Sequence, residues 1–123
     1  MAQPPAFGAV FGELRALLEP YAKRLVVRAD DPANFCLYTR HVPRYGKELF
    51  FGAAQVRKSY VSYHLFPVYM FPDLLDGLPA PLRARMQGKS CFNFKALDEH
   101  QLSHLDHLTQ RAFDRFTAEQ LVG

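Results

Sequence analysis

The chain has 123 residues, a length typical of one domain, and it should bury roughly two-thirds of its unfolded surface. Hydrophobic residues make up 49% and charged residues 22% of the sequence, which excludes an intrinsically disordered chain. The formal net charge of +3 is too small to indicate a nucleic-acid-binding protein by itself.

An amphipathic helix is predicted near the N-terminus. Its apolar residues recur at spacings of three and four and share one side of a helical wheel. They are Phe7, Val10, Phe11, Leu14, Leu17, Leu18 and Tyr21. Pro20 cannot donate to the helical hydrogen-bond ladder, so the helix should end or kink near it. We expect this helix to pack its apolar stripe on a sheet.

Four segments with strand-like patterns follow the helix. They span residues 25–27, 34–39, 48–56 and 60–66. Asp30-Asp31-Pro32 should close the first strand, residues 41–47 should form a loop, and Arg57-Lys58-Ser59 should turn the last two strands into a hairpin. In the fourth segment apolar and polar faces alternate with period two, which is typical of a half-buried strand. Val61, Tyr63 and Leu65 form one face, and Tyr60, Ser62 and His64 form the other.

Prolines interrupt the next part of the chain, at positions 67, 72, 79 and 81, so only short helices fit there. We place them at residues 72–76 and 80–86, with Gly88 as the stop of the second. Residues 90–95 return as a strand. Phe92 and Phe94 should lie on one of its faces, and Cys91 and Asn93 on the other.

A final helix is predicted from Asp98 to about Glu119. Asp98 as N-cap and Gln101 three residues later form a capping-box pattern. The buried stripe should hold Leu102, Leu105, Leu108, Ala112, Phe113 and Phe116. The order of elements predicts a single α+β domain over residues 1–123. It should have two layers, a mainly antiparallel sheet packed by the N- and C-terminal helices.

The cellular compartment is inferred from features that the sequence lacks. The apolar stretches are shorter than the roughly 20 residues of a membrane span, and the N-terminal residues show no secretory pattern. Cys36 and Cys91 are far apart in the sequence and form no paired motif. We therefore expect a cytoplasmic protein with reduced thiols and no membrane partner.

Two stretches resemble a known family. Residues 60–75, YVSYHLFPVYMFPDLL, and residues 86–94, MQGKSCFNF, are similar to the YdhG-like family of small bacterial domains of unknown function. The resemblance covers the chain from about residue 25 onward. It implies a strand, a proline-interrupted segment, a Gly-Lys turn into an aromatic strand, and a C-terminal helix. One branch of that family is proposed to act like frataxin, so the resemblance also implies an iron-handling alternative.

The leading functional hypothesis is a non-enzymatic binding or interaction module without a cofactor. Its ligand would be a small anionic or apolar molecule held between the sheet and the segment Pro67–Pro81. The polar residues expected at the wall of this cleft are His64, Tyr69, Lys89, Cys91 and Asn93. A nucleic-acid partner is not expected, because no recognised nucleic-acid motif accompanies the basic residues.

An enzyme is the alternative from a different class. His64 would act as a base with Cys91 or a tyrosine as its partner, and Lys89 would lower the pKa of the thiol if it shared a face with Cys91. On the final helix, His100, His104 and His107 share one face. That face is opposite the apolar stripe, so we expect these imidazoles to lie in solvent rather than to bind a metal.

Overall fold

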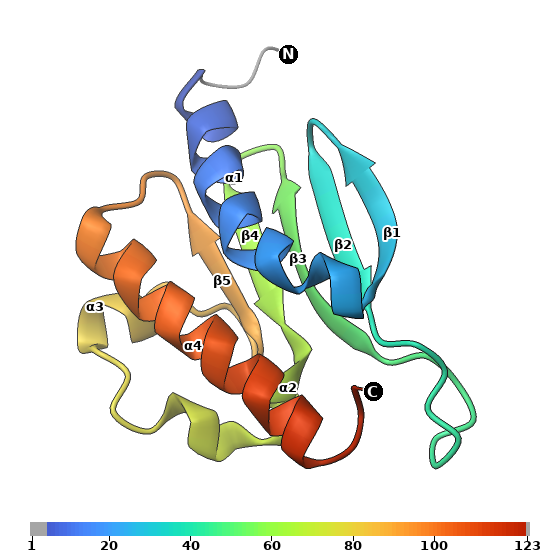
Figure 1. Cartoon of the computed structure of the whole chain (residues 1–123). Coiled ribbons are helices and arrows are strands. Elements are labelled where there is room, and N and C mark those ends of the chain that lie inside the picture. The colour runs from blue at the N-terminus through green and yellow to red at the C-terminus, as the bar shows by residue number, and fades with distance from the viewer. Residues whose placement is uncertain (1–4, 123) are drawn as a thin grey trace.

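The computed structural model describes residues 5–122 and shows a five-stranded sheet covered by helices on one face (Figure 1). The elements in chain order are α1 (Pro5–Leu18), η1 (Glu19–Arg24), β1 (Val26–Asp31), β2 (Asn34–Tyr38), β3 (Phe50–Val56), β4 (Val61–Leu65), α2 (Phe66–Met70), η2 (Pro72–Leu75), α3 (Ala80–Arg83), β5 (Cys91–Phe94) and α4 (Glu99–Ala118). Each strand pairs antiparallel with the next in the sequence. The predicted two-layer α+β architecture is confirmed.

The core lies between the sheet and the two long helices, α1 and α4. The predicted stripe of α1 is buried except for Tyr21, which follows in η1 and is half-buried. The stripe of α4 is also buried, although Leu102 is only partly covered near the start of the helix. Within this core the Tyr63 hydroxyl lies 2.6 Å from the Thr109 hydroxyl on α4. This buried hydrogen bond joins the middle of the sheet to the C-terminal helix.

Strand alternation separates a helix-covered face of the sheet from a bare face. In β4 the side chains of Val61, Tyr63 and Leu65 belong to the core, whereas Ser62 and His64 are directed to the opposite side. The β3 strand departs from simple alternation, because the register shifts between Leu37 and Tyr38. Phe51 is the extra residue of this bulge. Its ring joins the core, whereas Phe50 stays half-exposed on the bare face.

Two predicted boundaries in the first half of the chain are wrong. The first strand does not close at the Asp-Asp pair, because Asp30 and Asp31 pair with Phe35 and Asn34 in the β1–β2 ladder. The turn is tighter than expected and is stabilised by the Asp31 carboxylate, which accepts a 2.8 Å hydrogen bond from the Ala33 amide. The third strand begins at Phe50 instead of Glu48.

The proline-interrupted segment also differs from its prediction. A helix, α2, begins directly after β4, and Pro67 fits its first turn because no amide donor is required there. The helix α3 ends at Arg83, so Gly88 is not its stop. Gly88 has a φ of 80° in the turn that leads into β5, a backbone conformation that glycine adopts without strain. The segment therefore forms one wall of a cleft described below.

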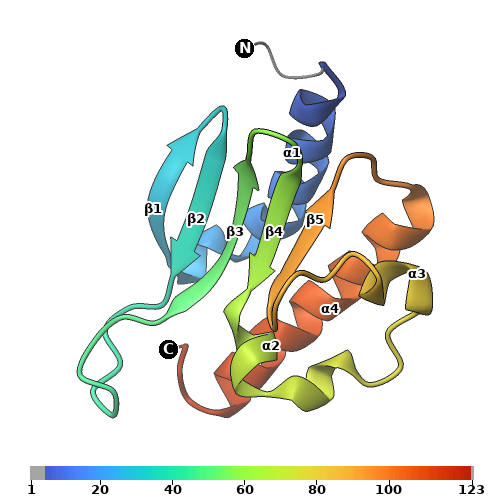
Figure 2. The ribbon, with the colours of Figure 1, turned by 180° about the vertical axis from the view of Figure 1, so that it is seen from behind.

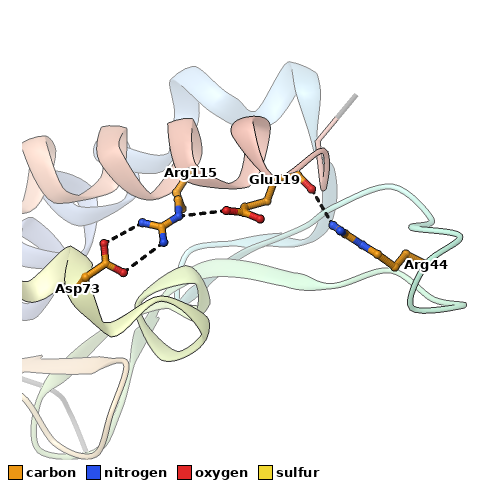
Figure 3. Close-up of polar contacts among 4 residues, drawn as sticks. All are labelled: Arg44, Asp73, Arg115 and Glu119. Carbon is orange, nitrogen blue, oxygen red and sulfur yellow. Dashed lines mark hydrogen bonds and ion pairs between the residues drawn. The ribbon is translucent and has the colours of Figure 1, made fainter.

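Both ends of α4 are fixed by polar contacts. The predicted capping box is present: the Asp98 carboxylate accepts from the Gln101 amide at 2.7 Å, and the Gln101 side chain accepts from the Asp98 amide at 3.1 Å. Near the other end, Arg115 binds the Asp73 carboxylate of η2 at 2.8 Å (Figure 3). In the same view Arg44 donates to the Glu119 carbonyl oxygen at 2.6 Å. These contacts hold η2 and the β2–β3 loop against the end of α4.

No helix within residues 5–122 combines the length and the apolar character needed to cross a bilayer.

Candidate functional site

Neither of the two long helices, α1 and α4, covers the second face of the sheet. Figure 2 shows β1 to β4 from this side, with α1 and α4 behind them. We call this surface the bare face, and its side chains include Cys36, Tyr38, Phe50, Ala53, Gln55, Ser62, His64, Cys91 and Asn93. The strand register places Cys36, Ala53, His64 and Cys91 in one row across four strands. A sheet face with this mixture of polar, sulfur and aromatic groups is suited to ligand contact rather than to core packing.

Three of the predicted site residues meet on the bare face. His64 and Cys91 are direct partners in the β4–β5 ladder, and the Cys91 sulfur lies 3.7 Å from the His64 Nε2 atom. The same sulfur lies 3.4 Å from the Asn93 Oδ1 atom. Thus His64, Cys91 and Asn93 form one polar cluster, as their strand alternation indicated.

The electrostatics of the cluster keep both titratable groups neutral at pH 7. Burial, followed by the positive charge of Arg57, lowers the pKa of His64 from its ordinary value of 6.5. Burial raises the pKa of the Cys91 thiol, an effect that Arg57 and the Tyr63 backbone hydrogen bond offset in part. The resting pair is therefore a thiol and a neutral imidazole. An activated cysteine nucleophile requires pKa shifts of the opposite direction, toward a thiolate–imidazolium pair.

Tyr69 and Lys89 lie elsewhere, in a cleft between α2, η2 and the turn before β5. The cleft has a volume of about 700 Å³. Its lining consists of Val68, Tyr69, Met70, Pro72, Leu75, Arg83, Met86, Gly88 and Lys89. We call it the Tyr69–Lys89 cleft, since the Lys89 ammonium lies 5.9 Å from the centroid of the Tyr69 ring.

The structure does not bring the five residues predicted from the sequence to a single wall. The strand β5 begins at Cys91, so Lys89 precedes it and lines the cleft with Tyr69. Arg57 rather than Lys89 supplies the positive charge that partly offsets the rise in the Cys91 pKa. The cleft lies beside the proline-rich segment, but none of its described lining residues belongs to a strand, so it does not lie between that segment and the sheet as predicted. Two of the five predicted residues line it, and the other three lie on the bare face.

A continuous row of aromatic rings connects the two places. Ring centroids are 5.4 Å apart for Tyr38 and Phe50, 6.2 Å for Phe50 and Phe66, and 5.5 Å for the stacked pair Phe66 and Tyr69. Phe50 and Phe66 were not among the residues predicted to form a site. The period-two pattern of the third strand could have indicated Phe50, had the bulge next to it been recognised.

The three histidines of α4 are all exposed, as predicted. His104 and His107 line a shallow hollow of about 170 Å³ together with Asp76 and Arg111. Across residues 5–122 the structure brings together no group of three or more His, Cys, Asp or Glu side chains that could hold a metal ion.

Comparison with known proteins yields no match: no family model, no curated protein and no solved structure is detectably similar to this chain. The resemblance to the YdhG-like family stays a prediction from residues 60–75 and 86–94.

Proposed function

We propose that the protein is a cytoplasmic binding module, which takes a small ligand with an apolar body and one anionic group into the Tyr69–Lys89 cleft. The observation that carries the proposal is the composition of the lining. Apolar side chains supply the body of the wall, and Arg83 and Lys89 supply positive charge. Among the lining residues that the structure describes, none carries a carboxylate.

The apolar part of the wall fits an aliphatic or aromatic body. Met70, Leu75 and Met86 are partly buried and still present surface to the cleft, whereas Val68 is buried. Two methionines give such a wall unusual adaptability, because their unbranched side chains repack easily. Pockets that combine a mainly apolar lining with a few oriented polar groups are the usual form of small-molecule sites.

The polar part of the wall fits an anion at the mouth of the cleft. The Arg83 guanidinium donates to the Leu75 carbonyl oxygen at 2.8 Å, which fixes its position beside the cleft. The Tyr69 side chain is 52% exposed, a high fraction for a large aromatic residue. A ligand that covered this ring would remove apolar surface from water while its acidic group met Lys89.

Octanoate tests this proposal, with octan-1-ol as the matched uncharged probe. We expect saturable octanoate binding by calorimetry or by NMR titration, and weaker binding of the alcohol. Replacing Lys89 by glutamine should weaken octanoate binding about threefold to tenfold, because a partly exposed charge pair contributes on the order of 1 kcal/mol. Binding of octan-1-ol should not change.

The control is Lys58→Gln, which removes the same charge from the β3–β4 turn, away from the cleft. Equal losses in the Lys89 and Lys58 variants would mean that only net charge matters, and the proposal would be rejected. The double replacement of His64 and Asn93 should leave octanoate binding intact, since both residues lie on the bare face.

The 3.7 Å contact between His64 and Cys91 favours a second candidate function, a cysteine-dependent enzyme. Its test is the pH dependence of Cys91 alkylation by chloroacetamide in a Cys36→Ser background. A raised thiol pKa means that the thiolate appears only at higher pH, so the rate should be low at pH 7 and climb through and beyond the ordinary value of 9.0. Fast alkylation at pH 7 that depended on His64 would instead support the enzyme.

A further inference from the structure

The bare face contains a hollow of its own, separate from the Tyr69–Lys89 cleft. Its volume is about 280 Å³, and it spans β2, β3 and β4. The lining consists of Cys36, Tyr38, Phe50, Gln55, Arg57 and His64. None of these residues lines the cleft, so a ligand here would be a second and independent occupant.

Flat side chains form one side of this hollow. The rings of Tyr38 and Phe50 have centroids 5.4 Å apart and planes tilted by 49°, and the His64 imidazole lies 6.2 Å from the Phe50 ring. The three side chains therefore offer separate ring faces rather than one flat platform. All three side chains are half-buried, so each is held by its neighbours and still presents part of its surface. Aromatic rings exposed on a sheet are favourable stacking partners for planar rings, at about 1–3 kcal/mol for each base-sized ring.

Polar groups with a fixed arrangement form the other side. The Arg57 guanidinium donates to the Gln55 side-chain oxygen, and the Gln55 amide donates to the Asn34 side-chain oxygen at 3.2 Å. This chain of contacts orients the guanidinium over the end of β3. Among the described residues of the lining, Arg57 carries the one charge, and it is positive.

We infer that this hollow binds a planar heteroaromatic ring that carries a negatively charged group, as a nucleoside monophosphate does. The ligand ring stacks on Tyr38 or on Phe50, whose planes differ by 49°, and the anionic group meets the Arg57 guanidinium. The ring edge finds hydrogen-bond partners in the Gln55 amide and the His64 imidazole. At about 280 Å³ the hollow is slightly smaller than the usual range of small-molecule sites, which favours a single ring system over a large cofactor.

The same geometry disfavours the ligand proposed for the cleft. A flexible aliphatic chain has no flat face to stack on Tyr38 and Phe50, and it cannot use the amide of Gln55. Conversely, the described lining of the cleft offers one exposed ring, Tyr69, and no side-chain amide. The two sites should therefore discriminate between a planar anion and an aliphatic anion.

Three probes separate the contributions of ring and charge: AMP, adenosine and ribose 5-phosphate, each titrated into isotope-labelled protein and followed by NMR. We expect AMP to bind at least tenfold more tightly than either of the other two. The resonances that move should belong to Tyr38, Gln55 and His64, while those of Tyr69 and Met86 stay in place. Ribose 5-phosphate binding as tightly as AMP would overturn the inference, because the ring would then contribute nothing.

Arg57→Gln should weaken AMP binding about tenfold and leave adenosine binding unchanged. Its control is Lys58→Gln, which removes the same charge from the adjacent residue and should not weaken AMP binding. Equal losses of AMP affinity in the two variants would show that only the net charge of the protein matters, and they would overturn the inference. Arg57→Gln should not change octanoate binding, and Lys89→Gln should not change AMP binding. A failed prediction for the hollow is therefore distinguishable from a failed prediction for the cleft.

Discussion

Replacing Phe51 by alanine should lower the free energy of unfolding by about 3–5 kcal/mol, the range of buried phenylalanine truncations. Phe51 is 0% exposed. Its ring meets Phe113 and Phe116 of α4 edge-on, with centroids 5.9 Å away in both cases. Truncation removes both contacts and leaves a cavity between sheet and helix. Urea denaturation followed by circular dichroism measures this loss as a decrease in the transition midpoint.

Phe50→Ala is the matched control, because it makes the same chemical change one residue earlier on the bare face. Phe50 is half-exposed, and its neighbours are Tyr38, His64 and Phe66. Its truncation should cost less than about 2 kcal/mol, since much of the ring is already in contact with water. The folded Phe50 variant should nevertheless bind AMP more weakly. Equal destabilisation by the two truncations would show that the face assignment at the bulge is wrong.

Periodicity is the reason that the sequence predicts the faces of β4 and β5 correctly. Alternation puts His64 on the side opposite Tyr63, and it puts Cys91 and Asn93 opposite Phe92. Residues that are directly paired in an antiparallel ladder point to the same face of the sheet. Once β4 and β5 pair, correct faces for both strands are therefore enough to bring His64 and Cys91 together. The polar cluster was therefore predictable from local pattern and one correct pairing.

The residues that line the Tyr69–Lys89 cleft were harder to predict from the sequence. The position of Lys89 depends on the path of the chain from Phe66 to Ser90, which short helices and proline turns determine. No periodic pattern reports such a path. The sequence pattern places Arg57 in the hairpin turn but does not show that its charge acts on the pKa values of His64 and Cys91 on the bare face. Tertiary geometry, rather than residue type, assigns these cations to their sites.

Replacing Gly52 by alanine is the second substitution with a large expected effect, a loss of about 1–3 kcal/mol through overpacking. An added Cβ at Gly52 would lie 2.9 Å from the His64 carbonyl oxygen and 3.2 Å from a methyl carbon of Leu18. The backbone oxygen cannot move away without disturbing the β3–β4 ladder, in which Gly52 pairs with Leu65. The strain should therefore also displace the His64 backbone and alter its amide resonance.

Gly12→Ala makes the same change in the opposite environment. Gly12 lies in the middle of α1, where an added Cβ meets nothing within 4 Å. Alanine there should stabilise the protein by about 0.5–1 kcal/mol, because glycine loses more backbone entropy than alanine on helix formation. The two variants should thus shift the urea midpoint in opposite directions. A neutral or stabilising Gly52→Ala would mean that β3 and β4 leave room for a side chain at this position. It would contradict the close contact between helix α1 and the sheet at Gly52.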